Sequence, residues 1–96
     1  MLSRENILSL LQTNKKSLME KYPINKMALF GSYSRKDNNL DSDVDILVDF
    51  NEQIGIRFID LADELSEILG KNVDLVSSKA IKDKYFKEIE RDLLYV

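Results

Sequence analysis

The sequence predicts a small α/β domain in which helices pack on a mixed β-sheet. Segments with a helical spacing of apolar residues alternate with short apolar segments typical of strands. The single proline and the three glycines fall between these segments, where they end or join elements. The chain has 96 residues, which supports one hydrophobic core and leaves no room for a second. We therefore expect residues 1–96 to form a single domain.

The chain is predicted to begin with a helix over residues 3–22, followed by a buried strand over residues 24–30. Ser3 is a suitable N-cap because its hydroxyl can accept a hydrogen bond from the first turn. Pro23 ends the helix, since the residue before a proline avoids the helical backbone conformation.

A Gly-Ser pair directly follows this strand, and the polar residues 33–39 after it can begin as a helical turn. Residues 43–50 then alternate in polarity, which indicates a strand with one buried face. Val44, Ile46, Val48 and Phe50 form the apolar face. The opposite face carries Asp43, Asp45, Leu47 and Asp49.

The second half of the chain predicts two helices, over residues 56–69 and 81–90, separated by a strand over residues 72–76. Gly70 suits the position just after the first of these helices, where a left-handed residue is favoured. Residues 93–96 form an apolar tail that is either a fourth strand or a docking segment. The apolar stripe expected to bury the 56–69 helix consists of Ile56, Ile59, Leu61, Ala62, Leu65, Ile68 and Leu69.

The composition excludes several kinds of chemistry. The chain contains no cysteine and no histidine, which excludes disulfides, thiolate or imidazole zinc sites, and Ser-His-Asp triads. Chemistry must use carboxylates, hydroxyls, Lys or Arg, backbone N–H groups, or a hard cation with oxygen ligands. No apolar run approaches the roughly 20 residues that span a bilayer, and the N-terminus lacks a signal pattern. We therefore expect a cytoplasmic protein without a membrane partner.

The net charge of −3 hides an acidic middle segment. Residues 41–67 hold nine acids and one base, a net charge of −8, whereas the remaining residues hold eight acids and thirteen bases, a net charge of +5. Such a segment argues against direct nucleic-acid binding there. It favours a metal site, a solvated face, or both.

The Gly31-Ser32 pair is a candidate phosphate site. Glycine lets the backbone approach a ligand closely, and backbone N–H groups with a hydroxyl at a helix start suit an anion. Taken alone, the pair is a weak signal, because such pairs end many strands as plain turns.

Asp43 and Asp45 are candidate metal ligands because they are spaced i, i+2 on one face of a strand, which places their Cβ atoms ~7 Å apart. Such carboxylates repel each other unless a cation lies between them, and a hard ion such as Mg²⁺ fits oxygen ligands. If the 72–76 strand is a neighbour, Asp74 joins them on one surface. Three carboxylates suit a two-metal site, with Asp74 as ligand and general base. The alternative is that all three are ordinary solvated strand residues.

These residues resemble a known family. Gly31-Ser32, ten further residues and Asp43-Val44-Asp45 match the Gly-Ser-x10-Asp-x-Asp signature of the polymerase-beta-like nucleotidyltransferases. The stretches from Gly31 to Arg35 and from Asp41 to Val48 look very like the minimal nucleotidyltransferases. Those are proteins of about this length and are commonly the antitoxin partner of a HEPN-domain ribonuclease toxin. The resemblance implies the nucleotidyltransferase fold over nearly the whole chain.

The resemblance also implies roles for individual residues. Gly31 and Ser32 would hold the phosphates of ATP, the substrate, and Arg35 would contact the triphosphate, unless it is only a surface ion-pair residue. Asp43, Asp45 and Asp74 would be the catalytic carboxylates and bind Mg²⁺. The sequence departs from the family at Lys36, where relatives commonly carry glycine. We expect Asn38 or Asn39 to make that turn instead.

By resemblance, the leading function is Mg²⁺-dependent transfer of AMP from ATP to a tyrosine hydroxyl of a HEPN toxin, so that the protein acts as an antitoxin. The alternative is a non-catalytic antitoxin that neutralises the HEPN ribonuclease by binding. A third interpretation, transfer to RNA or an antibiotic, is disfavoured because such enzymes carry an additional domain for the acceptor. The short chain leaves the nucleotide poorly enclosed, so a partner or a second copy of the chain is expected to complete the pocket.

Overall fold

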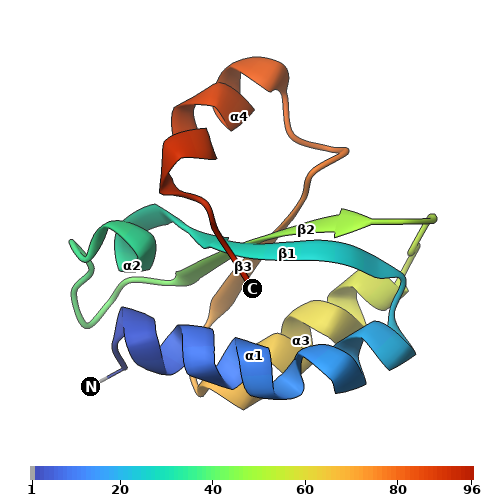
Figure 1. Cartoon of the computed structure of the whole chain (residues 1–96), viewed down its shortest axis with the longest axis horizontal. Helices are drawn as coiled ribbons and strands as arrows, with labels where there is room; N and C mark the ends of the chain where they lie inside the picture. Colours follow the sequence, from blue (N-terminus) through green and yellow to red (C-terminus); the bar gives the residue numbers. More distant parts are fainter. Residues whose placement is uncertain (1) are drawn as a thin grey trace.

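A computed structural model, which describes residues 2–96, shows a four-stranded mixed sheet with helices on both faces (Figure 1). The strand order is β3-β2-β1-β4. β1 (Ile24–Phe30) runs antiparallel to β2 (Val44–Phe50) and to β4 (Leu94–Tyr95), whereas β2 runs parallel to β3 (Val73–Ser77). The predicted α/β class with a mixed sheet is confirmed, and the C-terminal tail supplies the fourth strand.

Two helices cover one face of the sheet and form the main core. These are α1 (Arg4–Lys21), which Ser3 caps as predicted, and α3 (Arg57–Leu69) (Figure 1). Each buries an apolar stripe against the even-numbered side chains of β2. The fully buried side chains of this core include Ile7, Leu11, Leu18, Met27, Leu29, Val44, Ile46, Val48, Leu61 and Leu65.

The opposite face of the sheet carries a smaller apolar cluster beneath α4 (Asp83–Ile89) and the short 3₁₀ helix η1 (Glu90–Asp92). Its buried members are Phe30, Leu47 and Ile89, and partly buried members are Val76, Ile81, Phe86 and Leu93. Leu47 lies between Asp45 and Asp49 on the odd-numbered face of β2, so the predicted alternation along this strand is confirmed.

Two expectations about α3 are wrong: that the helix begins at Ile56, and that Ile56 and Ile59 belong to its buried stripe. The helix begins at Arg57, and residues Ile56 and Ile59 are 86% and 63% exposed. Buried Leu61, Leu65 and Leu69 recur every four residues on one side of the helix. Ile59 lies two residues before Leu61, about 200° around the helix axis at 3.6 residues per turn, and therefore faces away from the sheet.

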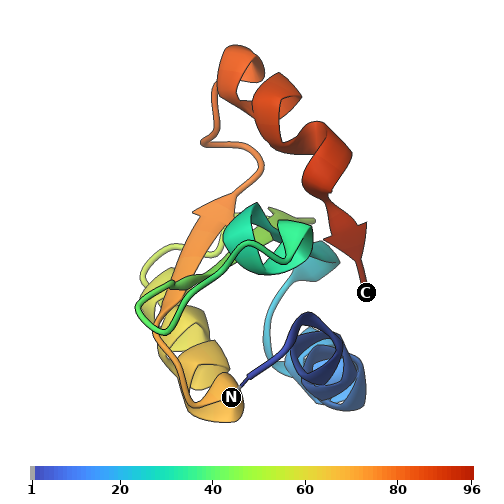
Figure 2. The same cartoon turned by 90° about the vertical axis from the view of Figure 1, so that its left-hand side faces the viewer.

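The turn after β1 is a five-residue helix, α2 (Gly31–Arg35), at one end of the sheet (Figure 2). Lys36 ends it in the left-handed conformation, with φ 65°. The expectation that Asn38 or Asn39 would make this turn is therefore wrong, because Lys36 itself adopts the positive φ that glycine adopts more easily. Among residues 2–96, no helix is both long and apolar enough to cross a membrane.

Candidate functional site

The site is built around the point where β1 passes directly into α2. Gly31 is the first residue of α2 and has φ 75°, a conformation that L side chains rarely adopt. A Cβ on Gly31 would overlap Oδ2 of Asp45 and would lie 3.0 Å from its Cγ. Glycine is therefore required here for two reasons, and its absent side chain lets the Asp45 carboxylate rest against the backbone of the turn.

Asp45 and Asp74 lie side by side on the face of the sheet that carries α4. They are register partners on the parallel strands β2 and β3, and Phe30, the last residue of β1, pairs with Asp45 from the other side. Asp45 is half-buried, whereas Asp74 is exposed. The third strand is therefore a neighbour of the second, which is the arrangement in which the sequence analysis expected Asp74 to join the other aspartates on one surface.

The environment of Asp45 disfavours its charge. Burial raises its pKa from the ordinary 3.8 to about 6, helped by the negative charge of Asp74, by a hydrogen bond with Asp74 and by the charge of Asp43, whereas Arg35 acts in the opposite direction. Two carboxylates this close share a proton or a cation more readily than they carry two charges. A hard divalent cation with oxygen ligands fits this donor set.

Asp43 is exposed and precedes β2, so it acts on Asp45 through space. In the side-chain positions observed for residues 2–96, no three carboxylates are placed to share one ion. The structure thus brings Gly31, Asp45 and Asp74 together and leaves Asp43 at the rim. The role of the three aspartates as metal ligands stays a prediction.

Ser32 lies half-buried in the first turn of α2. No side chain of the described residues caps the N-terminal end of this helix. Its first N–H groups therefore lack the side-chain acceptor that a capped helix has. N–H groups at a helix start beside a hydroxyl suit the oxygens of a phosphate, and that role of Gly31 and Ser32 stays a prediction.

Arg35, at the other end of α2, is held by two carboxylates. Its Nε lies 2.9 Å from Oδ2 of Asp37, and its Nη1 lies 3.2 Å from Oδ2 of Asp92 in η1. These hydrogen bonds raise the pKa of the guanidinium. A contact between Arg35 and a triphosphate would require it to exchange at least one of these partners.

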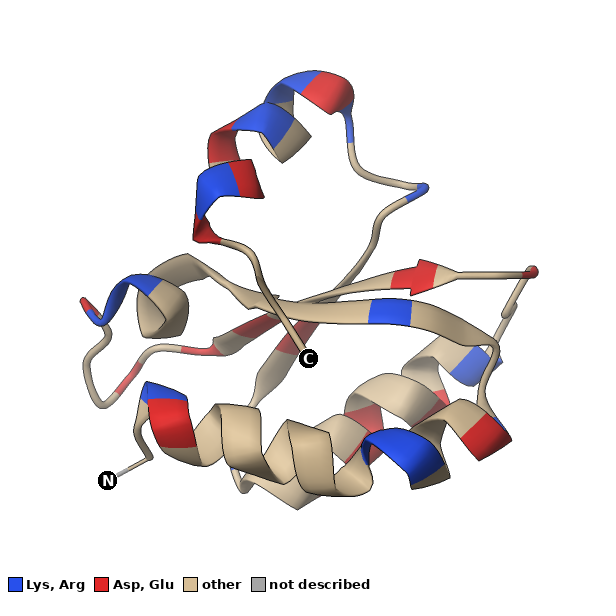
Figure 3. Ribbon diagram, viewed as in Figure 1, with Lys and Arg blue, Asp and Glu red and all other residues tan. Residues whose placement is uncertain are grey.

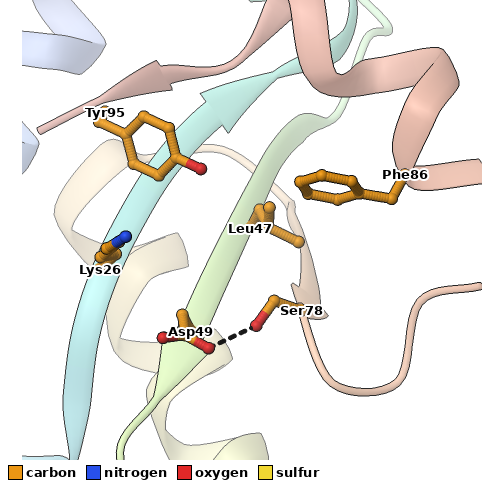
Figure 4. Close-up of a pocket in the computed structure, with 6 residues that line it drawn as sticks. All are labelled: Lys26, Leu47, Asp49, Ser78, Phe86 and Tyr95. Atoms are coloured by element: carbon orange, nitrogen blue, oxygen red, sulfur yellow. Dashed lines mark hydrogen bonds between the residues drawn. The ribbon is translucent and has the colours of Figure 1, made fainter. Parts of the chain in front are cut away.

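Asp49 lies on the same face of β2 as Asp45, but its surroundings favour the charged carboxylate, whereas those of Asp45 disfavour it. Its carboxylate accepts hydrogen bonds from Nδ2 of Asn25 at 2.8 Å and Oγ of Ser78 at 2.7 Å, and these bonds lower its pKa. It lines a pocket of about 250 Å³ beneath α4 (Figure 4). The other lining residues are Lys26, Leu47, Ser78, Phe86 and Tyr95. This pocket contains none of the predicted site residues, and the apolar cluster around Leu47 separates it from Asp45.

Two residues that the sequence analysis did not single out, Arg4 and Asp92, contact Ser34 near the C-terminal end of α2. Arg4, the first residue of α1, donates from Nη1 to the carbonyl oxygen of Ser34 at 3.1 Å. The hydroxyl of Ser34, which is buried, donates to the backbone oxygen of Asp92. No spacing in the sequence links these residues, which come from positions about 30 and 58 apart and meet only in the fold.

Comparison with known proteins places the chain in a wider group. A family model described as "Nucleotidyltransferase domain" matches residues 11–95. "Protein adenylyltransferase MntA" of Thermococcus cleftensis is 42% identical over 97 aligned positions, which cover 100% of this chain and 98% of that protein. A "Putative protein adenylyltransferase" of Methanocaldococcus jannaschii is 48% identical over 92 residues, 94% of each chain.

Solved structures share the fold. A structure described as that of a "putative minimal nucleotidyltransferase" superposes with a TM-score of 0.81 over 97% of this chain and 95% of that chain, at 23% identity. A toxin–antitoxin structure with AMP-PNP gives a TM-score of 0.71 at 26% identity, covering 98% and 72% of the two chains. A complex of tri-AMPylated Shewanella oneidensis HEPN toxin with MNT antitoxin gives 0.60 at 25% identity, covering 96% and 66%.

Proposed function

The chain belongs to the nucleotidyltransferase domain family, and from this premise we propose that it transfers AMP from ATP to a tyrosine hydroxyl of a HEPN toxin and so acts as its antitoxin. The observation that carries the proposal is the contact between Gly31 and the Asp45 carboxylate, with Asp74 beside it. This contact supports the proposal because nucleotidyl transfer depends on groups that bind phosphate lying beside carboxylates that can hold a metal ion.

The similarity to named proteins supports the finer parts of the proposal. The relatives of about the same length are described as protein adenylyltransferases, which favours AMP as the transferred group and a protein as the acceptor. Toxin–antitoxin structures with AMP-PNP and with an AMPylated HEPN toxin favour a toxin as that acceptor.

In the proposed reaction, the acceptor oxygen attacks the α-phosphorus of ATP, the bond to the bridging oxygen of the β-phosphate breaks, and pyrophosphate leaves. Asp74 accepts the proton of the hydroxyl, and its exposed position leaves it accessible to a side chain of another protein. The first N–H groups of α2 and the Ser32 hydroxyl hold phosphate oxygens. Arg35 contacts the triphosphate after leaving Asp37 or Asp92.

Asp43, Asp45 and Asp74 would hold Mg²⁺. Bound there, Mg²⁺ would neutralise charge on the triphosphate and lower the pKa of the attacking hydroxyl. The closeness of Asp45 and Asp74 supports this assignment, because a cation relieves the repulsion that otherwise raises the pKa of Asp45. The lack of histidine and cysteine is compatible with such chemistry, since it needs only oxygen ligands and positioning.

The test is transfer of label from ATP to the product of the neighbouring gene, which the proposal expects to be the HEPN partner. Reactions contain Mg²⁺ and ATP labelled on either the α- or the γ-phosphate, with wild-type protein or Asp43→Ala/Asp45→Ala. The proposal predicts that only the α-label reaches the partner, and only with wild-type protein. The matched control is Asp60→Ala/Asp63→Ala, which removes two exposed acids of α3 and should transfer like wild type.

Equal labelling by the Asp43→Ala/Asp45→Ala variant would show that the proposed site is wrong. Labelling from the γ-position would indicate phosphoryl transfer instead. If the double variant transfers no label yet still protects cells from the toxin, the alternative function, neutralisation by binding alone, accounts for the antitoxin role.

A further inference from the structure

We propose that Arg4 is a positioning residue for the nucleotide, which holds α2 in the orientation that its phosphate-binding end requires. This inference rests on the proposed function. Arg4 lies outside the residues that the family model matches, and its side chain reaches the end of α2 opposite to Gly31 and Ser32.

The contacts form a clamp around the last turn of α2. Arg4 Nη1 donates to the Ser34 carbonyl oxygen, and Lys36 Nζ lies 3.0 Å from Oε1 of Glu5, so both of the first two residues of α1 bind this turn. From the other side, the backbone oxygen of Asp92 in η1 accepts a hydrogen bond from the Ser34 hydroxyl. Figure 2, which looks at the molecule from this end, shows α2 between α1 and the C-terminal segment.

A helix as short as α2 needs such support. Five residues form little more than one turn, and isolated helices of that length are not stable because nucleation is costly. The N-terminal end of α2 has no side-chain cap, so nothing local fixes it there. The guanidinium of Arg4 binds one of the carbonyl groups that a helix leaves unpaired at its C-terminal end, where a cation also interacts favourably with the helix dipole.

The placement of Arg4 is not explained by stability alone. Its Nε is buried and has no hydrogen-bond partner among the described residues, and a buried unpaired donor costs free energy. An uncharged apolar side chain would avoid that cost. The contact of its Nη1 with the Ser34 carbonyl is therefore the feature that accounts for an arginine at this position.

The orientation of α2 matters because Gly31 and Asp45 are in van der Waals contact. A small rotation of α2 about its axis moves the first N–H groups and Ser32 relative to the carboxylate. Misplacement by about 1 Å of groups that bind a reacting substrate can cost large factors in rate. We expect loss of the Arg4 contact to weaken MgATP binding about tenfold, as for loss of a charge-assisted hydrogen bond.

The experiment compares Arg4→Met, which keeps the aliphatic stem, with Arg4→Lys, which restores a charged donor. The matched control is Arg57→Met, at the first residue of α3, where the guanidinium stacks on Tyr22, 5.1 Å from the ring centroid. Two quantities are measured on each folded protein: MgATP affinity by calorimetry, and amide exchange of Lys36 and Asp37, whose N–H groups bond back to the carbonyls of α2.

The proposal predicts faster exchange at these two amides and weaker MgATP binding in Arg4→Met, both largely restored in Arg4→Lys and unchanged in Arg57→Met. Unchanged exchange in Arg4→Met would overturn the clamp, and faster exchange with unchanged MgATP affinity would overturn its positioning role. If Arg4→Met does not fold, Ser34→Ala, which removes the bond to Asp92, must show the same two effects. Failure of the proposed function shows separately, as absence of AMP transfer by wild-type protein, while the exchange rates still decide the clamp.

Discussion

Replacing Asp45 by asparagine is expected to stabilise the metal-free protein while abolishing transfer. Asp45 is half-buried beside Asp74, and its pKa is raised from 3.8 to about 6. At pH values between 3.8 and about 6, the folded protein therefore keeps a proton on Asp45 that the unfolded chain has already released. Asparagine preserves the shape of the side chain and removes the charge that the folded state disfavours.

The pH dependence follows from the direction of this shift. Between pH 3.8 and about 6, the unfolded chain binds fewer protons at this residue than the folded protein does, so the stability of the wild type falls as pH rises through this window. A shift of about two pKa units corresponds to at most about 3 kcal/mol. Because Asp45 is only half-buried, solvent screening reduces this to roughly 1–2 kcal/mol at pH 7.5. For a domain of this size, that is a gain in Tm of roughly 5–10 °C.

Urea and thermal unfolding in EDTA, at pH 4 and at pH 7.5, measure the difference. The free energy of unfolding of Asp45→Asn should nearly equal that of wild type at pH 4. At pH 7.5 it should exceed that of wild type by the whole amount given above. Asp49→Asn is the matched control on the same face of β2, and it should lose stability at pH 7.5 because hydrogen bonds from Asn25 and Ser78 lower the pKa of Asp49. An Asp45→Asn variant that is no more stable than wild type at pH 7.5, or a gain that is independent of pH, would refute this reasoning.

Three further substitutions test the geometry of α2. Gly31→Ala and Gly70→Ala both place alanine at a positive φ, but only at Gly31 would a Cβ meet other atoms. In urea unfolding, Gly70→Ala should lower the free energy of unfolding by about 1 kcal/mol, and Gly31→Ala should lower it by more. Gly31→Ala should also lower the transfer rate about 100-fold. Lys36→Gly removes the left-handed strain at φ 65° and should gain about 0.5 kcal/mol in urea unfolding, and a loss would show that the Lys36 side chain contributes more than its strain costs. Asp92→Asn weakens an ion pair that holds Arg35. Because Arg35 is then freer to contact the triphosphate, the KM for ATP should fall about 1.5- to 5-fold. An unchanged KM would argue against that contact.

Much of the fold follows from side-chain periodicity. The alternation along residues 44–50 correctly separates the main core from the face that carries Asp45 and Asp49. The same periodicity in the third strand predicts Asp74 on that face, and the parallel register of β2 and β3 places it opposite Asp45. These predictions succeed because a strand has two faces and one of them must be buried.

Other features depend on tertiary structure and could not be predicted locally. Ile56 and Ile59 are apolar but exposed, since only the position of α3 on the sheet decides which side of the helix is covered. Lys36 adopts a positive φ that its own preference opposes, because the contacts around α2 fix the chain on both sides. The opposite environments of Asp45 and Asp49 arise from neighbours on other strands and loops, such as Asp74 and Ser78.

Charge shows the same limit of sequence reasoning. The acidic middle segment, residues 41–67, spreads over β2 and α3, and Figure 3 shows further acidic residues on β3 and on the other helices. One acid of the segment, Asp45, lies beside Asp74, which is outside the segment, whereas others form ion pairs, such as Glu64 with Lys21 at 2.5 Å. Net charge alone therefore could not assign them.

The central claim is that the Gly-Ser turn and the aspartates carry out AMP transfer to a HEPN partner. Its most direct test is the intact mass of that partner after co-expression with wild-type protein or with Asp43→Asn/Asp45→Asn. We predict that the partner gains one or more adenylyl groups, located on tyrosine, with wild-type protein only. A partner that is neutralised by wild-type protein without any gain in mass would contradict the claim, because binding alone would then account for the neutralisation.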